Sequence, residues 1–211
     1  MQVRRRERNR GMFVMGKRLI LSSFGLTSKK TRSLIKKELQ KDINLSEKKI
    51  YLFFEPYYSI EGLLVEACLN IGFRRENILL STEVRPEDIE EIKKVDYIYV
   101  TEGNTFEIAA LLKDRGIDEV IREAFKNGAT YSGASAGAML AGESIEEALL
   151  FDRNEVGLKD YKGLCLMDGI VIPHYTNEEC RRYIKNTGIG EKYKKIRSVA
   201  NNKILVINVK K

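Results

Sequence analysis

The sequence predicts an α/β protein, with a mostly parallel, open β-sheet that carries helices on both faces. Short apolar runs alternate along the chain with longer stretches whose apolar residues recur at helical spacing. Strands that are apolar throughout are typical of a parallel sheet covered on both sides. The 211 residues, 43% of them hydrophobic and 32% charged, suit one domain with a full core and would crowd a second.

Seven short apolar runs are the expected strands. They cover residues 18–23, 49–54, 77–81, 96–101, 129–133, 170–173 and 203–209. The carboxyl ends of parallel strands meet at one edge of a sheet, where active sites of such folds form. The loops that follow Thr101 and Gly133 therefore share the edge at which we expect chemistry.

The segments between these strands are the expected helices. Their apolar residues lie three and four positions apart, and Pro86 suits the first turn of one of them. Gly25 and Gly103 mark turns that follow strands. The expected helices cover residues 29–41, 60–71, 86–95, 105–115, 117–127 and 178–185.

The positive charge is concentrated at the N-terminus. Residues 1–10 carry five arginines and one glutamate, which is more than half of the net charge of +7. We expect residues 1–14 to be a basic, disordered extension and residues 15–211 to form a single domain. Binding of RNA by this extension is the alternative. Lysines alternate with acids elsewhere, as on a solvated surface, so nucleic acid is not the expected partner.

Other features exclude several classes of protein. No run of about 18 apolar residues indicates a membrane span, and the first residues lack the apolar core of a secretory signal. Cys68, Cys165 and Cys180 are widely spaced and odd in number, so we interpret them as buried thiols in a reducing compartment. We expect a cytoplasmic protein with no metal site, and with no cofactor because a dinucleotide fingerprint is missing.

The strongest local motif is Gly-Ala-Ser-Ala-Gly at residues 133–137, which matches G-x-S-x-G between an expected strand and helix. A serine on such a sharp turn projects its hydroxyl above the sheet edge, and small neighbours let helix and strand approach closely. The N-terminus of the helix offers N–H groups to an oxyanion. Ser135 is therefore the candidate nucleophile, although a tight structural turn would also explain the pattern.

His174 is the only histidine and directly follows the expected strand at residues 170–173. If Ser135 acts through a general base, this imidazole is the one available. A third residue should orient the imidazole. Spacing does not choose among the acids between the two, which are Glu143, Glu146, Glu147, Asp152, Glu155, Asp160 and Asp168.

Four segments in order resemble the peptidase E family of serine peptidases, which includes cyanophycinase-like enzymes. They are Glu-Gly-Asn-Thr-Phe at 102–106, Gly-Ala-Ser-Ala-Gly-Ala at 133–138, the stretch 156–164, and Pro-His-Tyr at 173–175. The resemblance extends from about residue 15 to the C-terminus. It implies the flavodoxin-like fold of class I glutamine amidotransferases, and hydrolysis through a Ser-His-acid triad and an acyl-enzyme.

The resemblance also implies roles for individual residues. Ser135 would attack the peptide carbonyl, and His174 would move the proton. Asp152 is the implied third member, and Asp160 is its competitor, with a structural turn as the alternative role for Asp160. The backbone N–H groups of two residues would bind the oxyanion, namely Gly103 and Ala136.

For the substrate, the resemblance implies small peptides, with N-terminal aspartate in the best-known members. Arg181 is a candidate for binding that carboxylate, and Asn104 and Thr105 are candidate substrate contacts from the turn. Glu102 departs from the family, because it stands where the family has glycine beside the oxyanion turn, and the C-terminus is short. The alternatives are an ester or isopeptide hydrolase and a catalytically silent ligand binder. For each of these functions, we expect the protein to be a monomer or a homodimer.

Overall fold

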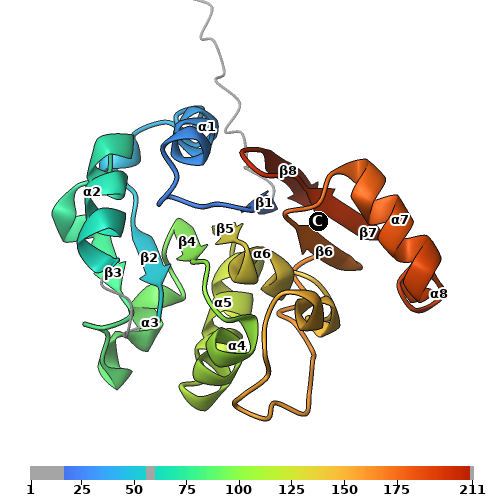
Figure 1. The fold of residues 1–211 in the computed structure, drawn as a ribbon. Coiled ribbons are helices and arrows are strands. Elements are labelled where there is room, and N and C mark those ends of the chain that lie inside the picture. Colours follow the sequence, from blue (N-terminus) through green and yellow to red (C-terminus); the bar gives the residue numbers. More distant parts are fainter. Residues whose placement is uncertain (1–16, 56–59, 210–211) are drawn as a thin grey trace, which may run out of the picture.

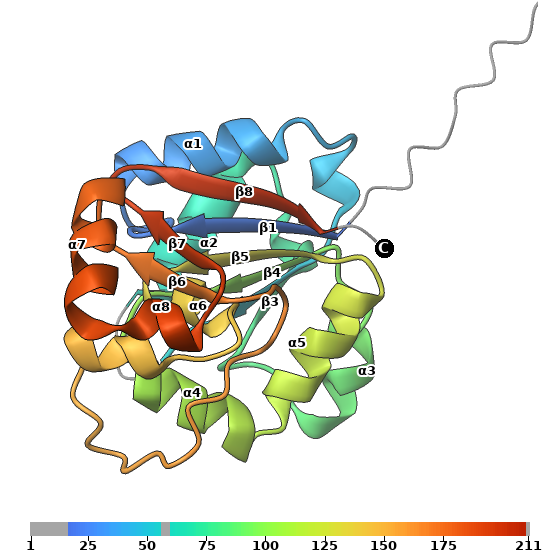
Figure 2. The ribbon, with the colours of Figure 1, turned by 90° about the vertical axis from the view of Figure 1, so that its right-hand side faces the viewer.

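The computed structural model describes residues 17–55 and 60–209, and its strands form one large and one small sheet (Figure 1). The strands are β1 (Lys17–Ser22), β2 (Ile50–Phe53), β3 (Ile78–Leu80), β4 (Tyr97–Val100), β5 (Thr130–Ala134), β6 (Ile170–Pro173), β7 (Ile196–Val199) and β8 (Ile204–Val209). The large sheet has the order β3-β2-β4-β5-β1-β8, and β6 pairs with β7. All pairs are parallel except β1 with β8, which run side by side in opposite directions (Figure 2). The predicted fold class is confirmed.

Helices cover both faces of the large sheet (Figure 1). They are α1 (Lys29–Leu39), α2 (Glu61–Ile71), α3 (Ile89–Ile92), α4 (Thr105–Asp114), α5 (Ile117–Lys126), α6 (Ala136–Leu140), α7 (Asn177–Thr187) and α8 (Ile189–Lys192). Short 3-10 turns are η1 (Leu45–Glu47), η2 (Arg75–Asn77), η3 (Pro86–Asp88) and η4 (Glu146–Leu150). Side chains of α1 and α2 join the core on one face, and those of α3 to α6 join the core on the other.

Strand β4 shows why this sequence forms a sheet covered on both sides. Tyr97 and Tyr99 pack into the core beneath α1 and α2, whereas Ile98 and Val100 pack into the opposite core. Each of the four side chains is at most 4% exposed. Because alternate residues of a strand point to opposite faces, a strand with no polar face must be buried on both.

The predicted elements agree with the structure to within a few residues. The main differences are one predicted helix that is divided and two elements that the sequence does not predict, α8 and β7. The helix predicted for residues 86–95 divides into η3 and α3, with Pro86 in the first turn as expected. Strand β7 is not among the predicted strands, because Ile196–Val199 is short and includes Arg197 and Ser198. This strand matters for function, since the turn after it lies at the same edge as the end of β6.

Other expectations concern the N-terminal extension and the cysteines. The basic extension at residues 1–14 lies outside the described residues. Cys68 and Cys180 are buried as expected, whereas Cys165 is exposed. Across 17–55 and 60–209, the helices are too short or too polar to cross a membrane. The same residues contain no group of three His, Cys, Asp or Glu side chains that is placed to hold a metal ion.

Candidate active site

Ser135 lies on a strained turn between β5 and α6. Its backbone has φ 46° and ψ −104°, a conformation that costs energy for a residue with a side chain. The turn is held by its own N–H, which donates to Ser22 O at 2.9 Å. A Cβ on Gly133 would lie 2.3 Å from Gly137 O, and one on Gly137 would lie 2.2 Å from Val100 O. Glycine is therefore required on both sides of the serine.

His174 follows β6 and reaches this serine. Its Nε2 lies 2.9 Å from Ser135 Oγ. The backbone of His174 is also strained, with φ 65°. Its N–H donates to Ser23 Oγ at 2.8 Å, and Ser23 Oγ in turn donates to Val199 O. The end of β1 thus contacts both residues of the Ser-His pair, through Ser22 and Ser23.

Asn201 is the residue that faces the other side of the imidazole. Its Oδ1 lies 2.9 Å from His174 Nδ1. An amide oxygen accepts a hydrogen bond from Nδ1–H, which leaves Nε2 as the acceptor for the serine hydroxyl. The amide orients the ring as a carboxylate would, but it adds no negative charge to stabilise an imidazolium.

Asp152, which the family resemblance implied as the third member, makes other contacts. Its Oδ2 accepts from Thr105 N at 2.9 Å and from Thr105 Oγ1 at 2.6 Å. A carboxylate in this place stabilises the N-terminal end of α4. The structure therefore brings Asn201, and not Asp152, to hydrogen-bonding distance of the imidazole.

Asn104 and Thr105, the predicted substrate contacts, lie at the N-terminal end of α4, where Asp152 also binds. Asn104 caps α4, because its Oδ1 accepts from the N–H groups of Phe106 and Glu107. Its Nδ2 donates to the backbone carbonyl of residue 153 at 2.9 Å. With Thr105 bound to Asp152, both side chains connect α4 to the segment after η4.

Arg181, the third candidate for a substrate contact, lies exposed on α7. Among the described residues, the arginine of this helix that forms an ion pair is its neighbour Arg182, which lies 4.0 Å from Glu178. Within residues 17–55 and 60–209, Arg181 forms no hydrogen bond or ion pair with the side chains around Ser135.

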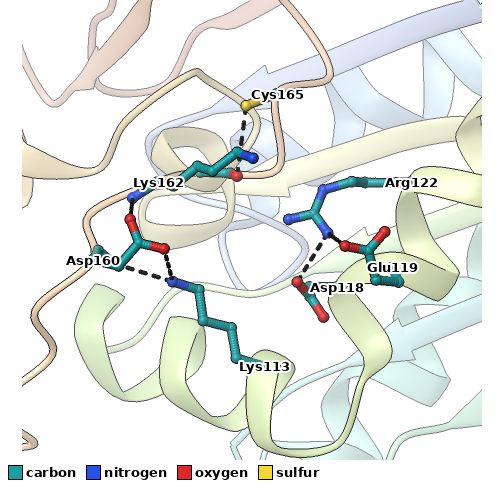
Figure 3. A network of polar contacts seen from close by, with 8 residues as sticks. Lys113, Asp118, Glu119, Arg122, Asp160, Lys162 and Cys165 are labelled. Carbon is teal, nitrogen blue, oxygen red and sulfur yellow. Dashed lines mark hydrogen bonds and ion pairs between the residues drawn. The ribbon is translucent and has the colours of Figure 1, made fainter.

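Asp160, the competing acid, takes part in a surface network (Figure 3). It pairs with Lys113 Nζ at 3.0 Å and accepts from Lys162 N at 2.9 Å. The hydrogen bond from Lys113 holds the pKa of Asp160 below its usual value. These contacts agree with the structural turn that is the alternative role for this residue.

The expected oxyanion donors lie at the ends of neighbouring strands. Gly103 has φ 154°, and a Cβ there would lie 3.2 Å from the Glu55 carboxyl carbon. Thr101 Oγ1 donates to Glu102 O at 2.9 Å, so the N–H of Gly103 points to the other side of that peptide. Among the described residues, neither Gly103 N nor Ala136 N donates a hydrogen bond to the protein.

The sequence matches a known protein family. The model for peptidase family S51 matches residues 19–211. The chain belongs to peptidase family S51. The predicted resemblance to peptidase E is confirmed at this level, because several of the curated relatives are named Peptidase E.

Individual relatives of this family S51 member match over part of their length. An uncharacterized peptidase of Listeria monocytogenes is 36% identical over 114 residues, which are 53% of this chain and 56% of that protein. Peptidase E of Salmonella arizonae is 36% identical over 92 residues, 42% of this chain and 39% of that protein. The matched region thus spans about half, or less, of the length of these curated relatives.

Solved structures share the fold. A structure described as a candidate peptidase E protein from Listeria monocytogenes has a TM-score of 0.65 and 25% identity, covering 92% of this chain and all of that one. A peptidase from an acI-B1 actinobacterium has a TM-score of 0.63 at 17% identity, covering 92% of this chain and 84% of that one. The second likeness shows the fold alone.

Glu102 of this family S51 member is held by hydroxyl groups. The half-buried carboxylate accepts from Thr27 Oγ1 and, at 3.5 Å, from Tyr99 OH. Tyr99 OH also accepts from Leu26 N at 2.9 Å. A Cβ on Gly25 would lie 1.8 Å from Tyr99 OH, so glycine is needed in that turn. The carboxylate is thus fixed against the turn that follows β1.

Glu55 is a residue of the site that the sequence motifs do not mark. It follows β2, is 3% exposed, and neither carboxylate oxygen has a partner within the described residues. Burial raises the pKa of Glu55 to about 7, and the negative charges of Glu107 and Asp152 add to the rise. The side chain lies against Gly103. Its place at the end of an apolar strand is the one signal in the sequence that could have found it.

Proposed function

We propose that this chain is a serine peptidase that hydrolyses small peptides through an acyl-enzyme. The observation that carries the proposal is the 2.9 Å contact between Ser135 Oγ and His174 Nε2, made by a serine on a strained turn. A nucleophile and a base within hydrogen-bonding distance are the minimum for this chemistry. Membership of a peptidase family supports the same reaction class.

In the proposed reaction, Ser135 Oγ forms a bond to the peptide carbonyl carbon while His174 Nε2 takes its proton. The carbonyl oxygen gains the negative charge and receives hydrogen bonds from the N–H groups of Gly103 and Ala136. The C–N bond then breaks, and Nε2 gives its proton to the leaving amine. Water, deprotonated by the same nitrogen, releases the acyl group and restores the serine.

Asn201 takes the role of the third member in this proposal. It selects the tautomer in which Nε2 accepts the proton of Ser135. Because the amide is neutral, the imidazolium that forms during the reaction receives less stabilisation than from a carboxylate. We therefore expect a slower enzyme than one with a Ser-His-acid triad.

The preference for an N-terminal aspartate that the family resemblance implies is not part of this proposal. It requires a cationic side chain near the acyl side of the substrate, and Arg181, the candidate, is exposed on α7. Burial raises the pKa of Glu55 beside Gly103, and the charges of Glu107 and Asp152 add to the rise. These negative charges oppose an acidic substrate group at that turn. We expect peptides with a neutral N-terminal residue to be cleaved faster.

The test is a dipeptide panel of Asp-Leu, Glu-Leu, Ala-Leu and Lys-Leu with wild type and Ser135→Ala. We expect hydrolysis that falls by several orders of magnitude in the variant, as for loss of a nucleophile. Equal melting temperatures of the two proteins serve as the folding control. Turnover that survives in Ser135→Ala would overturn the mechanism, and faster cleavage of Asp-Leu than of Ala-Leu would overturn the substrate preference.

The neutral partner of His174 favours a second candidate, a family member that hydrolyses activated esters or isopeptides, or that binds a ligand without turnover. Labelling with a fluorophosphonate probe separates these cases, because it requires a nucleophilic serine but no amide substrate. Labelling of Ser135 without dipeptide cleavage would favour the hydrolase of another substrate. A folded protein that resists both would favour the binding role.

A further inference from the structure

Two aromatic rings flank the imidazole of His174. The Phe24 ring lies with its centroid 5.3 Å from that of the imidazole, and the Phe151 ring lies at 5.9 Å, both in edge-on geometry. Phe24 comes from the turn after β1 and Phe151 from the end of η4. The two residues are 38% and 37% exposed, so both are accessible to solvent beside the candidate base.

The apolar surface continues from Phe151. The ring of Tyr175 lies 5.7 Å from that of Phe151, and the ring of Tyr183 on α7 lies 6.2 Å from Tyr175. Leu149 and Leu150, the two residues before Phe151, are 54% and 42% exposed. Exposed apolar side chains that gather at one place, rather than being scattered, mark a binding surface.

The proposed mechanism determines which residue of the substrate contacts this apolar surface. In the proposed mechanism, His174 Nε2 gives its proton to the leaving nitrogen, and proton transfer needs hydrogen-bonding distance. The residue that carries this nitrogen must therefore lie against the imidazole. Its side chain then has Phe24 or Phe151 as a neighbour. The acyl part of the substrate lies at Gly103 and Ala136 instead.

We propose that Phe24 and Phe151 form a subsite for the leaving residue of the peptide, and that this subsite selects a large apolar side chain. The inference rests on the proposed function for the direction of the substrate. An apolar side chain removes the exposed ring surface from water, whereas an acidic one would lose its hydration there without a partner.

A simpler explanation for the two rings is that they hold the imidazole in place. The experiment must distinguish this positioning role from the subsite role. A positioning role would lower kcat for every substrate by the same factor when a ring is removed. A subsite role lowers kcat/KM for large leaving residues and leaves the smallest one nearly unchanged. The ratio between substrates is therefore the informative quantity.

The experiment compares Ala-Ala, Ala-Leu, Ala-Phe and Ala-Asp as substrates of wild type, Phe24→Ala and Phe151→Ala. Leu69→Ala is the matched control, since Leu69 is 45% exposed on α2. For wild type and the control, we expect kcat/KM to be about 10-fold or more higher for Ala-Leu and Ala-Phe than for Ala-Ala. In the two ring variants the ratio should approach one. An unchanged ratio, with all rates lowered together, would overturn the subsite.

A binding measurement separates failure of this inference from failure of the proposed function. Calorimetry on Ser135→Ala with phenylalaninamide and alaninamide tests the subsite without catalysis. Tighter binding of phenylalaninamide that is lost in Phe151→Ala would support the subsite even if wild type cleaves no dipeptide. Equal binding of the two amides, or masking of the surface by a dimer that Phe151→Ala dissociates, would overturn it.

Discussion

Ser23 Oγ accepts a hydrogen bond from the backbone N–H of His174 at 2.8 Å and connects the end of β1 to the candidate base. The same hydroxyl donates to Val199 O, at the end of β7. This buried hydroxyl thereby connects the large sheet to the small one at the backbone of His174. The strained backbone of His174 is stabilised by this contact.

We expect Ser23→Ala to weaken both folding and catalysis. The substitution leaves an N–H and a C=O without their partner, which should lower the free energy of unfolding by about 1–3 kcal/mol. Displacement of the imidazole should lower kcat roughly 10- to 100-fold. Ser22→Ala is the matched control, because Ser22 Oγ makes only a 3.4 Å contact with Gly133 O. Equal kcat values for the two variants would contradict the positioning role.

The role of Asn201 predicts opposite effects of two substitutions. Asn201→Ala should lower kcat by about tenfold or more, because the imidazole loses the contact that sets its tautomer. Asn201→Asp should raise kcat, since a carboxylate stabilises the imidazolium, and should move the acid limb of the pH–rate profile to higher pH. Steady-state kinetics between about pH 5 and 9 measure both. A profile that is identical in wild type and Asn201→Asp would show that residue 201 does not act on the imidazole.

The Ser-His pair could be predicted from the sequence because both signals are local. Gly133 to Gly137 describe a turn whose geometry depends on near neighbours, and His174 has no competitor of its kind in the chain. The same holds for the central strands β2 and β4, whose side chains join the apolar cores on both faces of the sheet. Register and order within the sheet, in contrast, depend on contacts between distant segments.

Asn201 could not be predicted because nothing local marks it. Its position next to the imidazole depends on β7 and on the pairing of β7 with β6. Residues 196–199 of β7 include two polar side chains and therefore lack the apolar character of the central strands. Glu55 escapes prediction for another reason, since a single acid after a strand is common. Its burial and its contact with Gly103 arise only when β2 and β4 are neighbours.

Glu147 predicts a pH-dependent stability. It is 1% exposed in η4, neither carboxylate oxygen has a partner within the described residues, and burial raises its pKa to about 8. In the unfolded chain the group titrates near 4.5, so between about pH 4.5 and 8 the folded protein keeps a proton that the unfolded chain loses. Its contribution to the free energy of unfolding therefore falls as the pH rises through this window.

We expect Glu147→Gln to remove that fall and to raise the free energy of unfolding by roughly 1–3 kcal/mol at about pH 8. Glu146→Gln is the matched control, because Glu146 forms an ion pair with Lys192, which lowers its pKa. Loss of this surface pair should cost less than about 1 kcal/mol. Urea unfolding at several pH values measures the difference. Parallel curves for wild type and Glu147→Gln would contradict the assignment.

Substitution of Asp152 distinguishes two roles. The family resemblance implies that it is the acid of the triad, whereas its contacts with Thr105 indicate that it stabilises α4. Because its carboxylate binds the N–H and the hydroxyl of Thr105 in the first turn of α4, it should affect folding, so Asp152→Ala should lower the free energy of unfolding by about 1–2 kcal/mol. Thr105→Val removes the same hydroxyl contact and should cause a similar loss. Because both residues have this structural role, kcat should fall less than about tenfold in both variants. A loss of roughly 10⁴-fold, confined to Asp152→Ala, would instead identify it as the acid of a triad.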